Sequence, residues 1–406
     1  MNLRLFSSLS QAKSTLSQWQ EWLFNSSTSF LFLNEQLAEH KKNEILSSIQ
    51  KFLEVTPITT DPFFLVPTSG TTSVNLKIVL ITKKKFLQAA QRANTFLQAT
   101  MADSWLISLP LHHVAGLSIL ARAHLGKNDI HYWPKWNPKE FLEKLSHGNI
   151  TFCSLVPTQI FDVLAENISA PKHLKRVLVG GSALSDAHYQ QMLTRGWPLL
   201  KTYGMTETSA FMSFSTGDEF YQPLPGVAIR LDVNQRLAIH NDCLFEGYLV
   251  QSNETWQYQE KKLHEGYWST EDRAEFKTAT PSQFRLLGRE QGMIKIKGEL
   301  VNVHLLNVRL IDIAAGLGLS APIIHYVANQ RNENELFVLL SKNQDPNDYV
   351  STFKRFNQDV LPYERIGWYI QIDDVPRTEL GKIKISVLNS DSFKEAYREN
   401  RKIILD

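Results

Sequence analysis

The chain has 406 residues, 43% of them hydrophobic and 21% charged, with a formal net charge of +2 at pH 7. This length allows a large buried core and two or three domains of ordinary globular composition. The near balance of charge argues against bulk attraction to nucleic acid, and no apolar run is long enough for a membrane span.

The two cysteines, Cys153 and Cys243, lie in apolar stretches. Two thiols in so long a chain suggest neither a disulfide framework nor a cysteine metal site. They are interpreted as small core residues of a protein in a reducing compartment. The N-terminal stretch lacks the apolar region and cleavage site of a signal peptide, so we expect a cytoplasmic protein.

Residues 1–60 are polar and predict helices. These are expected to anchor on a neighbouring core through Trp19, Trp22, Leu23 and Phe24. From residue 63 to about 205, short apolar runs alternate with amphipathic segments. The expected strands are 63–66, 78–81, 104–109, 150–156, 174–179 and 198–203, and the expected helices include 83–100, 137–147 and 157–166. Such alternation predicts a parallel sheet covered on both faces, with ligands at the carboxyl ends of its strands.

Short β-type runs follow from 226 to 288, such as Leu237–His240 and Phe284–Leu287, and predict a smaller β subdomain. Beyond Gly292, about 115 residues are a sensible size for a compact α+β domain. Its expected elements are strands at 323–327, 336–340 and 368–372 and a helix near 347–359. We therefore divide the chain into residues 1–290 and 291–406.

A hydroxyl-rich stretch, Leu65–Lys77, lies between two apolar runs. Five hydroxyl side chains surround Gly70 there: Thr68, Ser69, Thr71, Thr72 and Ser73. Backbone N–H groups and hydroxyls in such a turn surround phosphate oxygens in known sites, and Lys77 adds positive charge. Taken alone, such a stretch is more often an ordinary turn.

Four later stretches form a pattern with this loop. They are Tyr203–Glu207 (Tyr-Gly-Met-Thr-Glu), Gly266–Asp272, Leu287–Arg289 and Pro376–Lys384, which contains Thr-Glu-Leu-Gly-Lys. In this order, the five stretches resemble the motifs of the adenylate-forming acyl-CoA synthetase superfamily. The resemblance spans roughly residues 63–384. It implies an α/β fold with a large N-terminal domain of mixed and parallel sheets, a β subdomain and a small mobile α+β lid domain.

A further stretch, Leu109–Arg122 (beginning Leu-Pro-Leu-His-His-Val-Ala-Gly), looks like the corresponding segment of the o-succinylbenzoate–CoA ligases of menaquinone synthesis. The superfamily reaction has two steps. A carboxylate attacks the α-phosphate of ATP to give an acyl-adenylate and pyrophosphate, and the coenzyme A thiolate then displaces AMP. The expected partners are therefore a small-molecule acid, ATP, Mg²⁺ and coenzyme A, and a homodimer is also an expectation.

The resemblance assigns most of the nucleotide site. The residues expected to hold the β- and γ-phosphates are Thr68, Ser69, Gly70, Thr71, Thr72 and Lys77. Thr206, after Tyr203 and Gly204, would contact the α-phosphate, and Glu207 would hold Mg²⁺. The plain alternative for Glu207 is an exposed carboxylate at the start of a helix.

The remaining roles on the nucleotide follow from the same resemblance. Asp272 and Arg289 would contact the ribose, and Lys382 would enter the site from the lid to stabilise charge during adenylation. Each has a plain alternative: a turn aspartate, a surface salt bridge and a solvated turn lysine, respectively.

The acyl site is expected around His113 and Arg122, with the Gly180-Gly181-Ser182 turn admitting the acyl group to the backbone. An aryl acid with a second carboxylate needs fixed donors or a cation, because an unpaired buried carboxylate is very costly. His113 is the first candidate. The alternatives are a histidine that only packs in the core and an arginine that points to solvent.

The phosphate loop departs from the family pattern. Ser73 replaces the usual second glycine, Asn75 replaces proline, and the lysine follows one position late, after Leu76. Glu271 replaces the glycine of Thr-Gly-Asp. These changes leave three hypotheses: an o-succinylbenzoate ligase with an altered phosphate clamp, a ligase for another aryl or fatty acid, and a nucleotide-binding protein without ligase activity.

Overall fold

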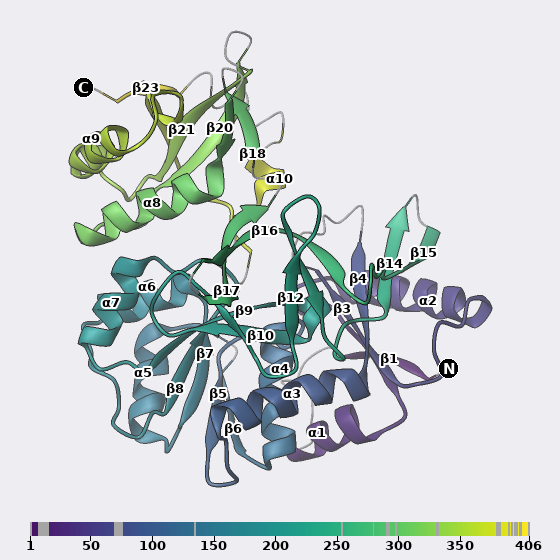
Figure 1. Ribbon diagram of the computed structural model, residues 1–406. Helices are drawn as coiled ribbons and strands as arrows, with labels where there is room; N and C mark the ends of the chain where they lie inside the picture. The colour runs from purple at the N-terminus through teal and green to yellow at the C-terminus, as the bar shows by residue number, and fades with distance from the viewer. Residues whose placement is uncertain are drawn as a thin grey trace.

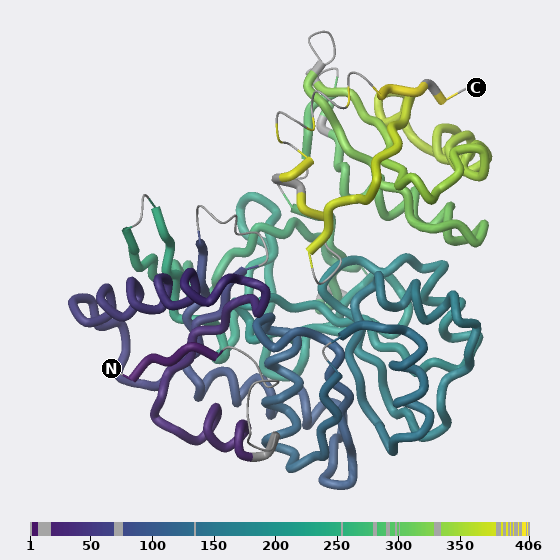
Figure 2. Tube along the Cα trace, turned by 180° about the vertical axis from the view of Figure 1, so that it is seen from behind, coloured from purple at the N-terminus to yellow at the C-terminus, as the bar shows by residue number. Residues whose placement is uncertain are grey.

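The computed structural model of the protein is shown in Figure 1, and from behind in Figure 2. It describes residues 2–6, 16–68, 76–133, 135–252, 255–278, 280–289, 293–296, 299–329, 333–378, 383–388, 390, 393, 397 and 400–404. In both views the described C-terminal part forms a smaller lobe next to the larger body that precedes it.

One mixed sheet of six strands lies on the side of the molecule that carries the N-terminus. Across the sheet its strands are β1 (Leu3–Phe6), β2 (Ser29–Phe32), β3 (Phe63–Pro67), β4 (Lys77–Thr82), β14 (Gly247–Ser252) and β15 (Thr255–Glu260). β1, β2 and β3 run parallel, whereas β3–β4, β4–β14 and β14–β15 are antiparallel pairs.

Both faces of the inner strand β3 are buried, because the run Phe63–Val66 is apolar at every position. Phe64 and Val66 of β3 face the helices at the centre of the molecule, whereas Phe63 and Leu65 face the outer cluster that includes helix α2 (Glu39–Val55). All four side chains are at most 1% exposed. The alternation follows from the pleat of a strand, which sends successive side chains to opposite faces.

The second sheet has seven strands. Across it lie β11 (Gln222–Pro223), β10 (Ala210–Ser215), β9 (Leu199–Met205), β8 (Arg176–Val179), β7 (Phe152–Leu155), β5 (Ser104–Ile107) and β6 (Asp129–Tyr132). The strands from β9 to β6 are parallel. The helices between the two sheets are α1 (Leu16–Asn25), α3 (Lys83–Leu97) and α4 (Val114–Gly126). The outer face of the second sheet is covered by α5 (Pro138–His147), α6 (Pro157–Ala165) and α7 (Asp186–Thr194), as Figure 1 shows.

A smaller antiparallel sheet of four strands follows. It contains β12 (Ala228–Leu231), β13 (Arg236–His240), β16 (Trp268–Lys277) and β17 (Thr280–Arg289). β17 also touches the second sheet, because Tyr221 and Phe284 pair as an isolated bridge. The β subdomain therefore stands at the same edge as the end of β9 (Figure 1).

The C-terminal part has its own cores and two sheets. Its elements are β18 (Met293–Ile296), β19 (Glu299–Asn302), α8 (Val303–Gly316), β20 (Ile323–Asn329), β21 (Glu333–Ser341), α9 (Val350–Asp359), β22 (Trp368–Ile372), α10 (Ile385–Leu388) and β23 (Lys402–Ile403). No helix in the described part of the chain is both long and apolar enough to cross a membrane.

Helix α8 connects the C-terminal part to the rest. Asn302, which caps the helix, donates from its side-chain amide to the carbonyl of Leu287. Further along, the Asp312 carboxylate accepts from the backbone N–H of Ala187 at 3.4 Å, at the start of α7. Burial raises the pKa of Asp312, although its hydrogen bonds oppose this change. The two parts therefore meet through α8.

The predicted fold class is confirmed, and two details were wrong. Residues 1–60 contain β1 and β2 as well as helices, because two short apolar runs join a sheet completed by distant strands. The runs at 63–66 and 78–81 do not join the parallel sheet of the later strands; they pair antiparallel in the first sheet. The domain boundary expected at 290/291 lies outside the described residues and stays a prediction.

Candidate active site

The carboxyl ends of β5, β8 and β9 lie on the same edge of the second sheet, since these strands are parallel. His113 follows β5, the turn at Gly180 and Gly181 follows β8, and Tyr203–Glu207 ends β9. Ligands bind at such an edge in open α/β sheets. The topology therefore brings the predicted acyl and nucleotide stretches to one side of the sheet.

Tyr203, Asp272 and Arg289 form a hydrogen-bonded cluster. The Tyr203 hydroxyl donates to Oδ2 of Asp272 at 2.7 Å, and Nε of Arg289 donates to Oδ1 at 2.9 Å. The aspartate and the arginine are direct partners in the β16–β17 register. The structure thus joins three residues that the sequence placed in three separate motifs.

The electrostatics of this cluster keep Tyr203 and Arg289 protonated. Burial, and next the Asp272 carboxylate, raise the pKa of Tyr203 well above its ordinary value, so the phenol remains a donor. Burial alone would lower the pKa of Arg289, but the charge of Asp272 and the hydrogen bond to it raise the value. Asp272 lies between these two donors, with remaining lone pairs for a further hydroxyl donor.

Gly204 is required by the tight return of the chain after β9. A Cβ at this position would lie 1.6 Å from the carbonyl oxygen of Ala210. Two non-glycine residues in the same turn have positive φ, Ser209 at 59° and Ala210 at 77°. Strained backbone of this kind persists where surrounding structure holds it, often at functional sites.

Thr206 and Glu207 lie in the short 3₁₀ turn after β9, Thr206–Thr208. The Glu207 carbonyl accepts from the backbone N–H of Phe245 at 2.9 Å. In the described part of the chain, the Thr206 hydroxyl has no hydrogen-bond partner, and it is half-buried. The turn therefore places a hydroxyl and a carboxylate side by side.

Tyr248 connects Glu207 with Lys77, and no sequence motif had pointed to it. The Tyr248 hydroxyl donates to Oε1 of Glu207 at 3.0 Å, and the Lys77 ammonium lies 3.8 Å from the centre of its ring. Burial, and next the Glu207 charge, raise the pKa of Tyr248, so its phenol remains protonated. Tyr248 reaches the site only because β14 pairs with β4, which lies far away in the sequence, so no local pattern could have identified it.

The residues around Glu207 fit Mg²⁺. Its second carboxylate oxygen, Oε2, makes no hydrogen bond to any described residue. Among the described residues, no group of three or more histidine, cysteine or acidic side chains could enclose a metal. Mg²⁺ commonly binds through one or two carboxylates and completes its shell with phosphate oxygens and water. A single carboxylate beside a phosphate site is consistent with this coordination.

The phosphate stretch begins and ends at one point. Both the backbone N–H and the hydroxyl of Thr68 donate to the carbonyl of Lys77, at 3.1 and 3.4 Å. Four of the predicted clamp residues, Ser69, Gly70, Thr71 and Thr72, lie outside the described residues, as does Lys382. Their roles stay predictions.

On the acyl side, His113 precedes helix α4 and is half-buried, with its ring 4.3 Å from that of buried His112. Gly180 is half-buried, and Gly181 and Ser182 are exposed in the turn after β8. His113 and the Gly180–Ser182 turn lie at the carboxyl ends of β5 and β8, on the same side of the sheet as the Tyr203 cluster. This agrees with a shared site, although no contact assigns their roles.

Arg122 does not point to solvent. Its side chain is 3% exposed, its Nη2 donates to the Ser118 hydroxyl at 2.7 Å, and its guanidinium lies 5.1 Å from the Trp105 ring centre. Nη1 has no hydrogen-bond partner in the described structure. Burial lowers the pKa of Arg122 to about 9. A buried cation without an anion is energetically costly, so a carboxylate ligand would relieve that cost.

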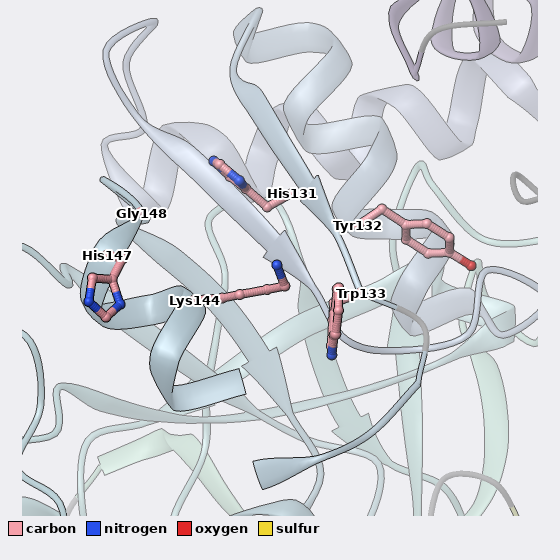
Figure 3. Close-up of a pocket in the computed structure, with 6 residues that line it drawn as sticks. All are labelled: His131, Tyr132, Trp133, Lys144, His147 and Gly148. Carbon is pink, nitrogen blue, oxygen red and sulfur yellow. The ribbon is translucent and has the colours of Figure 1, made fainter. Parts of the chain in front are cut away.

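A separate surface pocket of about 390 Å³ lies between β6, the outermost strand of the second sheet, and the end of α5 (Figure 3). It is lined by His131, Tyr132, Trp133, Lys144, His147 and Gly148. The Lys144 ammonium lies over the Trp133 ring, 4.0 Å from its centre. None of the predicted site residues lines this pocket, so it is not the candidate active site.

Comparison with known proteins agrees with this geometry. The chain is 26% identical over 349 residues to the 2-succinylbenzoate–CoA ligase of Staphylococcus epidermidis strain ATCC 35984, covering 81% of this chain and 69% of that enzyme.

Solved structures match in fold. An o-succinylbenzoate CoA synthetase from Bacillus subtilis, in complex with the acyl-adenylate intermediate OSB-AMP, superposes with a TM-score of 0.75 at 16% identity, covering 96% of this chain and 87% of that one. The same enzyme with ATP and a magnesium ion gives 0.72 at 17% identity, covering 89% and 84%.

A model of the family described as "AMP-binding enzyme" matches residues 11–249, more than half of the chain. The chain therefore belongs to the AMP-binding enzyme family.

Proposed function

We propose that the protein is an ATP-dependent acid–CoA ligase that converts o-succinylbenzoate to o-succinylbenzoyl-CoA in menaquinone biosynthesis. In the first step a carboxylate oxygen forms a bond to the α-phosphorus of ATP, and the bond to the β-phosphate bridge breaks to release pyrophosphate. In the second step the coenzyme A thiolate forms a C–S bond to the acyl carbon, and AMP leaves.

The nucleotide would be held by the residues gathered at the end of β9. Asp272, fixed by Tyr203 and Arg289, offers lone pairs for the ribose hydroxyls. Thr206 presents a hydroxyl for the α-phosphate, and Glu207 offers a carboxylate oxygen for Mg²⁺. When bound, Mg²⁺ supplies charge neutralisation on the polyphosphate.

Arg122 would select the acid by binding its second carboxylate. A guanidinium buried with an unpartnered N–H is suited to the second carboxylate of an aromatic dicarboxylic acid, because the pair forms charge-assisted hydrogen bonds. Its bond to Ser118, one helical turn earlier in α4, turns the head group toward the N-terminal end of the helix, which His113 precedes. A fatty acid or benzoate would leave this cation without an anion.

The C-terminal part would act as a lid in this reaction. Lys382 would approach the α-phosphate during adenylation and withdraw when the lid turns for coenzyme A. The contacts of α8 with Leu287 and Ala187 would then change between the two steps. We further propose a cytoplasmic enzyme, and the homodimer stays a prediction.

The test is pyrophosphate release with ATP, Mg²⁺ and a panel of acids, followed by thioester formation with coenzyme A. We expect o-succinylbenzoate to react, with benzoate and fatty acids reacting poorly. Turnover of benzoate or fatty acids without o-succinylbenzoate would overturn the choice of acid. No pyrophosphate with any acid would instead favour a nucleotide-binding protein without ligase activity.

Arg122→Gln sharpens this test. Loss of a buried charged hydrogen bond costs about 2 to 5 kcal/mol, so KM for o-succinylbenzoate should rise about a hundredfold. Residual turnover of benzoate and of 3-benzoylpropionate, each with one carboxylate, should stay within about twofold. Arg176→Gln is the control, because Arg176 is exposed and bonds the carbonyl of its neighbour Lys175. Equal loss with all acids would contradict the role.

A further inference from the structure

Tyr248 is the common contact of two charged groups in the candidate nucleotide site. Its hydroxyl donates to Oε1 of Glu207 at 3.0 Å, and its ring faces the Lys77 ammonium at 3.8 Å. A lysine and a carboxylate that both contact one tyrosine side chain would otherwise attract each other directly. The phenol gives each of them a separate partner.

The sheet register places Lys77 and Tyr248 together. In the antiparallel pair of β4 and β14, Lys77 stands opposite Val250 and Val79 stands opposite Tyr248. Lys77 and Tyr248 are thus diagonal neighbours on one face, within reach of a long side chain and an aromatic ring. A shift of one residue moves a strand side chain to the other face. The late position of the lysine therefore brings its ammonium onto this ring.

The segment that carries Tyr248 also holds the backbone of Glu207. The Phe245 N–H donates to the Glu207 carbonyl at 2.9 Å. The Phe245 ring packs against Tyr248, with centres 4.7 Å apart. Side chain and backbone of the carboxylate are therefore fixed from the same short stretch before and within β14.

We propose that Tyr248 is a positioning residue that keeps Lys77 and Glu207 apart, so that the lysine serves the phosphates and the carboxylate serves the divalent cation. Its hydroxyl fixes one oxygen of Glu207 and leaves Oε2 for Mg²⁺. Its ring supports the ammonium through the π face, which attracts a cation without neutralising it. Without the ring, lysine and carboxylate would pair and both would be lost to the nucleotide.

This inference rests on the proposed ATP site, and its test needs no acid substrate. The measurement is calorimetric binding of α,β-methylene-ATP at a series of Mg²⁺ concentrations. In Tyr248→Phe the ring remains and the hydroxyl is lost, so the Mg²⁺ concentration for half-maximal binding should rise about tenfold, the usual effect of losing a bond to a metal ligand. Binding without Mg²⁺ should stay within twofold.

A double variant tests the separation itself. Tyr248→Leu should weaken Mg²⁺-dependent binding more than Tyr248→Phe, because Lys77 is then free to pair with Glu207. Adding Lys77→Ala to Tyr248→Leu should lower the Mg²⁺ concentration for half-maximal binding about threefold or more relative to Tyr248→Leu, although it removes a phosphate contact. A residue that only supports the fold would give no recovery.

The matched control is Tyr258→Phe. Tyr258 lies on the neighbouring strand β15, and its hydroxyl donates to the backbone carbonyl of Glu246 at 3.0 Å. This variant should bind as the wild type does. Unchanged Mg²⁺ dependence in Tyr248→Phe, or a double variant no better than Tyr248→Leu, would overturn the inference while wild-type binding supports the ATP site. A wild type that binds no nucleotide would instead overturn the proposed function.

Discussion

Asp272 and Arg289 stand opposite each other on strands β16 and β17, and each oxygen of the aspartate is held by a different donor. The aspartate is 9% exposed, so the ion pair is largely sheltered from water on the carboxylate side. The strand pairing itself therefore orients the two groups that are proposed to face the ribose.

Asp272→Asn should weaken nucleotide binding. The amide keeps the shape but removes the charge that faces Arg289, and a hydrogen bond to a charged group contributes about 1.5 to 3 kcal/mol. We expect AMP affinity in calorimetry to fall about tenfold or more. Asp232→Asn is the control, because Asp232, in the turn between β12 and β13, accepts from Nε of Arg236 at the same 2.9 Å. Equal losses in both variants would rule out a specific role for Asp272.

Gly204→Ala should destabilise the protein. A methyl group there would overlap the Ala210 carbonyl at 1.6 Å, and overpacking of this kind costs about 1 to 3 kcal/mol or more. The thermal midpoint should fall by about 2 °C or more. Gly316→Ala is the comparison, since nothing lies within 4 Å of a Cβ at Gly316. A midpoint for Gly204→Ala equal to that of Gly316→Ala would contradict the crowded turn.

Lys83 should make the stability of the fold depend on pH. It is 3% exposed, donates to the Ser26 carbonyl at 2.9 Å, and lies over the rings of Phe30 and Phe64. Burial lowers the pKa of Lys83 from 10.5 to about 8. Between about pH 8 and 10.5 the unfolded chain binds more protons than the folded protein, so this lysine makes the free energy of unfolding rise with pH. Below about pH 8 Lys83 is protonated in both states, and burial of its charge then lowers stability by the full amount.

The measurement is the urea midpoint of wild type and Lys83→Met from pH 7 to 10. Relative to the wild type, the variant should lose stability as the pH rises through this range. Lys84→Met, at the exposed neighbouring position, should follow the wild type. A constant difference between wild type and Lys83→Met would show that Lys83 does not titrate in this window.

Lys382→Ala should separate the two half-reactions. Adenylation, followed by pyrophosphate release, should fall about a thousandfold, because the lysine is proposed to stabilise charge on the α-phosphate. Thioester formation from preformed adenylate should be largely spared. Equal loss in both steps would contradict the rotation of a lid between them.

Helices whose ends and buried faces depend on neighbouring residues could be predicted from the sequence. The helix expected at 137–147 is α5, and its cap, Asn137, accepts from the backbone N–H three residues on. The pattern of apolar residues in 83–100 likewise predicted α3, which ends at Leu97. These elements depend on neighbouring residues, so the sequence alone contains the information.

Pairing partners could not be predicted in the same way. The strand 78–81 was identified, but its placement beside β14 joins segments about 170 residues apart. Tyr248 was missed for this reason, since its importance comes from that pairing and not from a motif. Arg122 was identified, but its burial against Trp105 depends on how α4 packs between the sheets.

The position of β4 has a further consequence for the synthesis of the chain. Its apolar residues Ile78–Ile81 pair with β3 on one side, and until Gly247–Ser252 is made the other edge has no strand to bond. An open apolar edge is a template for association with other chains. The arrival of β14 closes this edge and, in the same step, delivers Tyr248 to Lys77. Completion of the nucleotide site and protection of the nascent sheet against aggregation are thus one event.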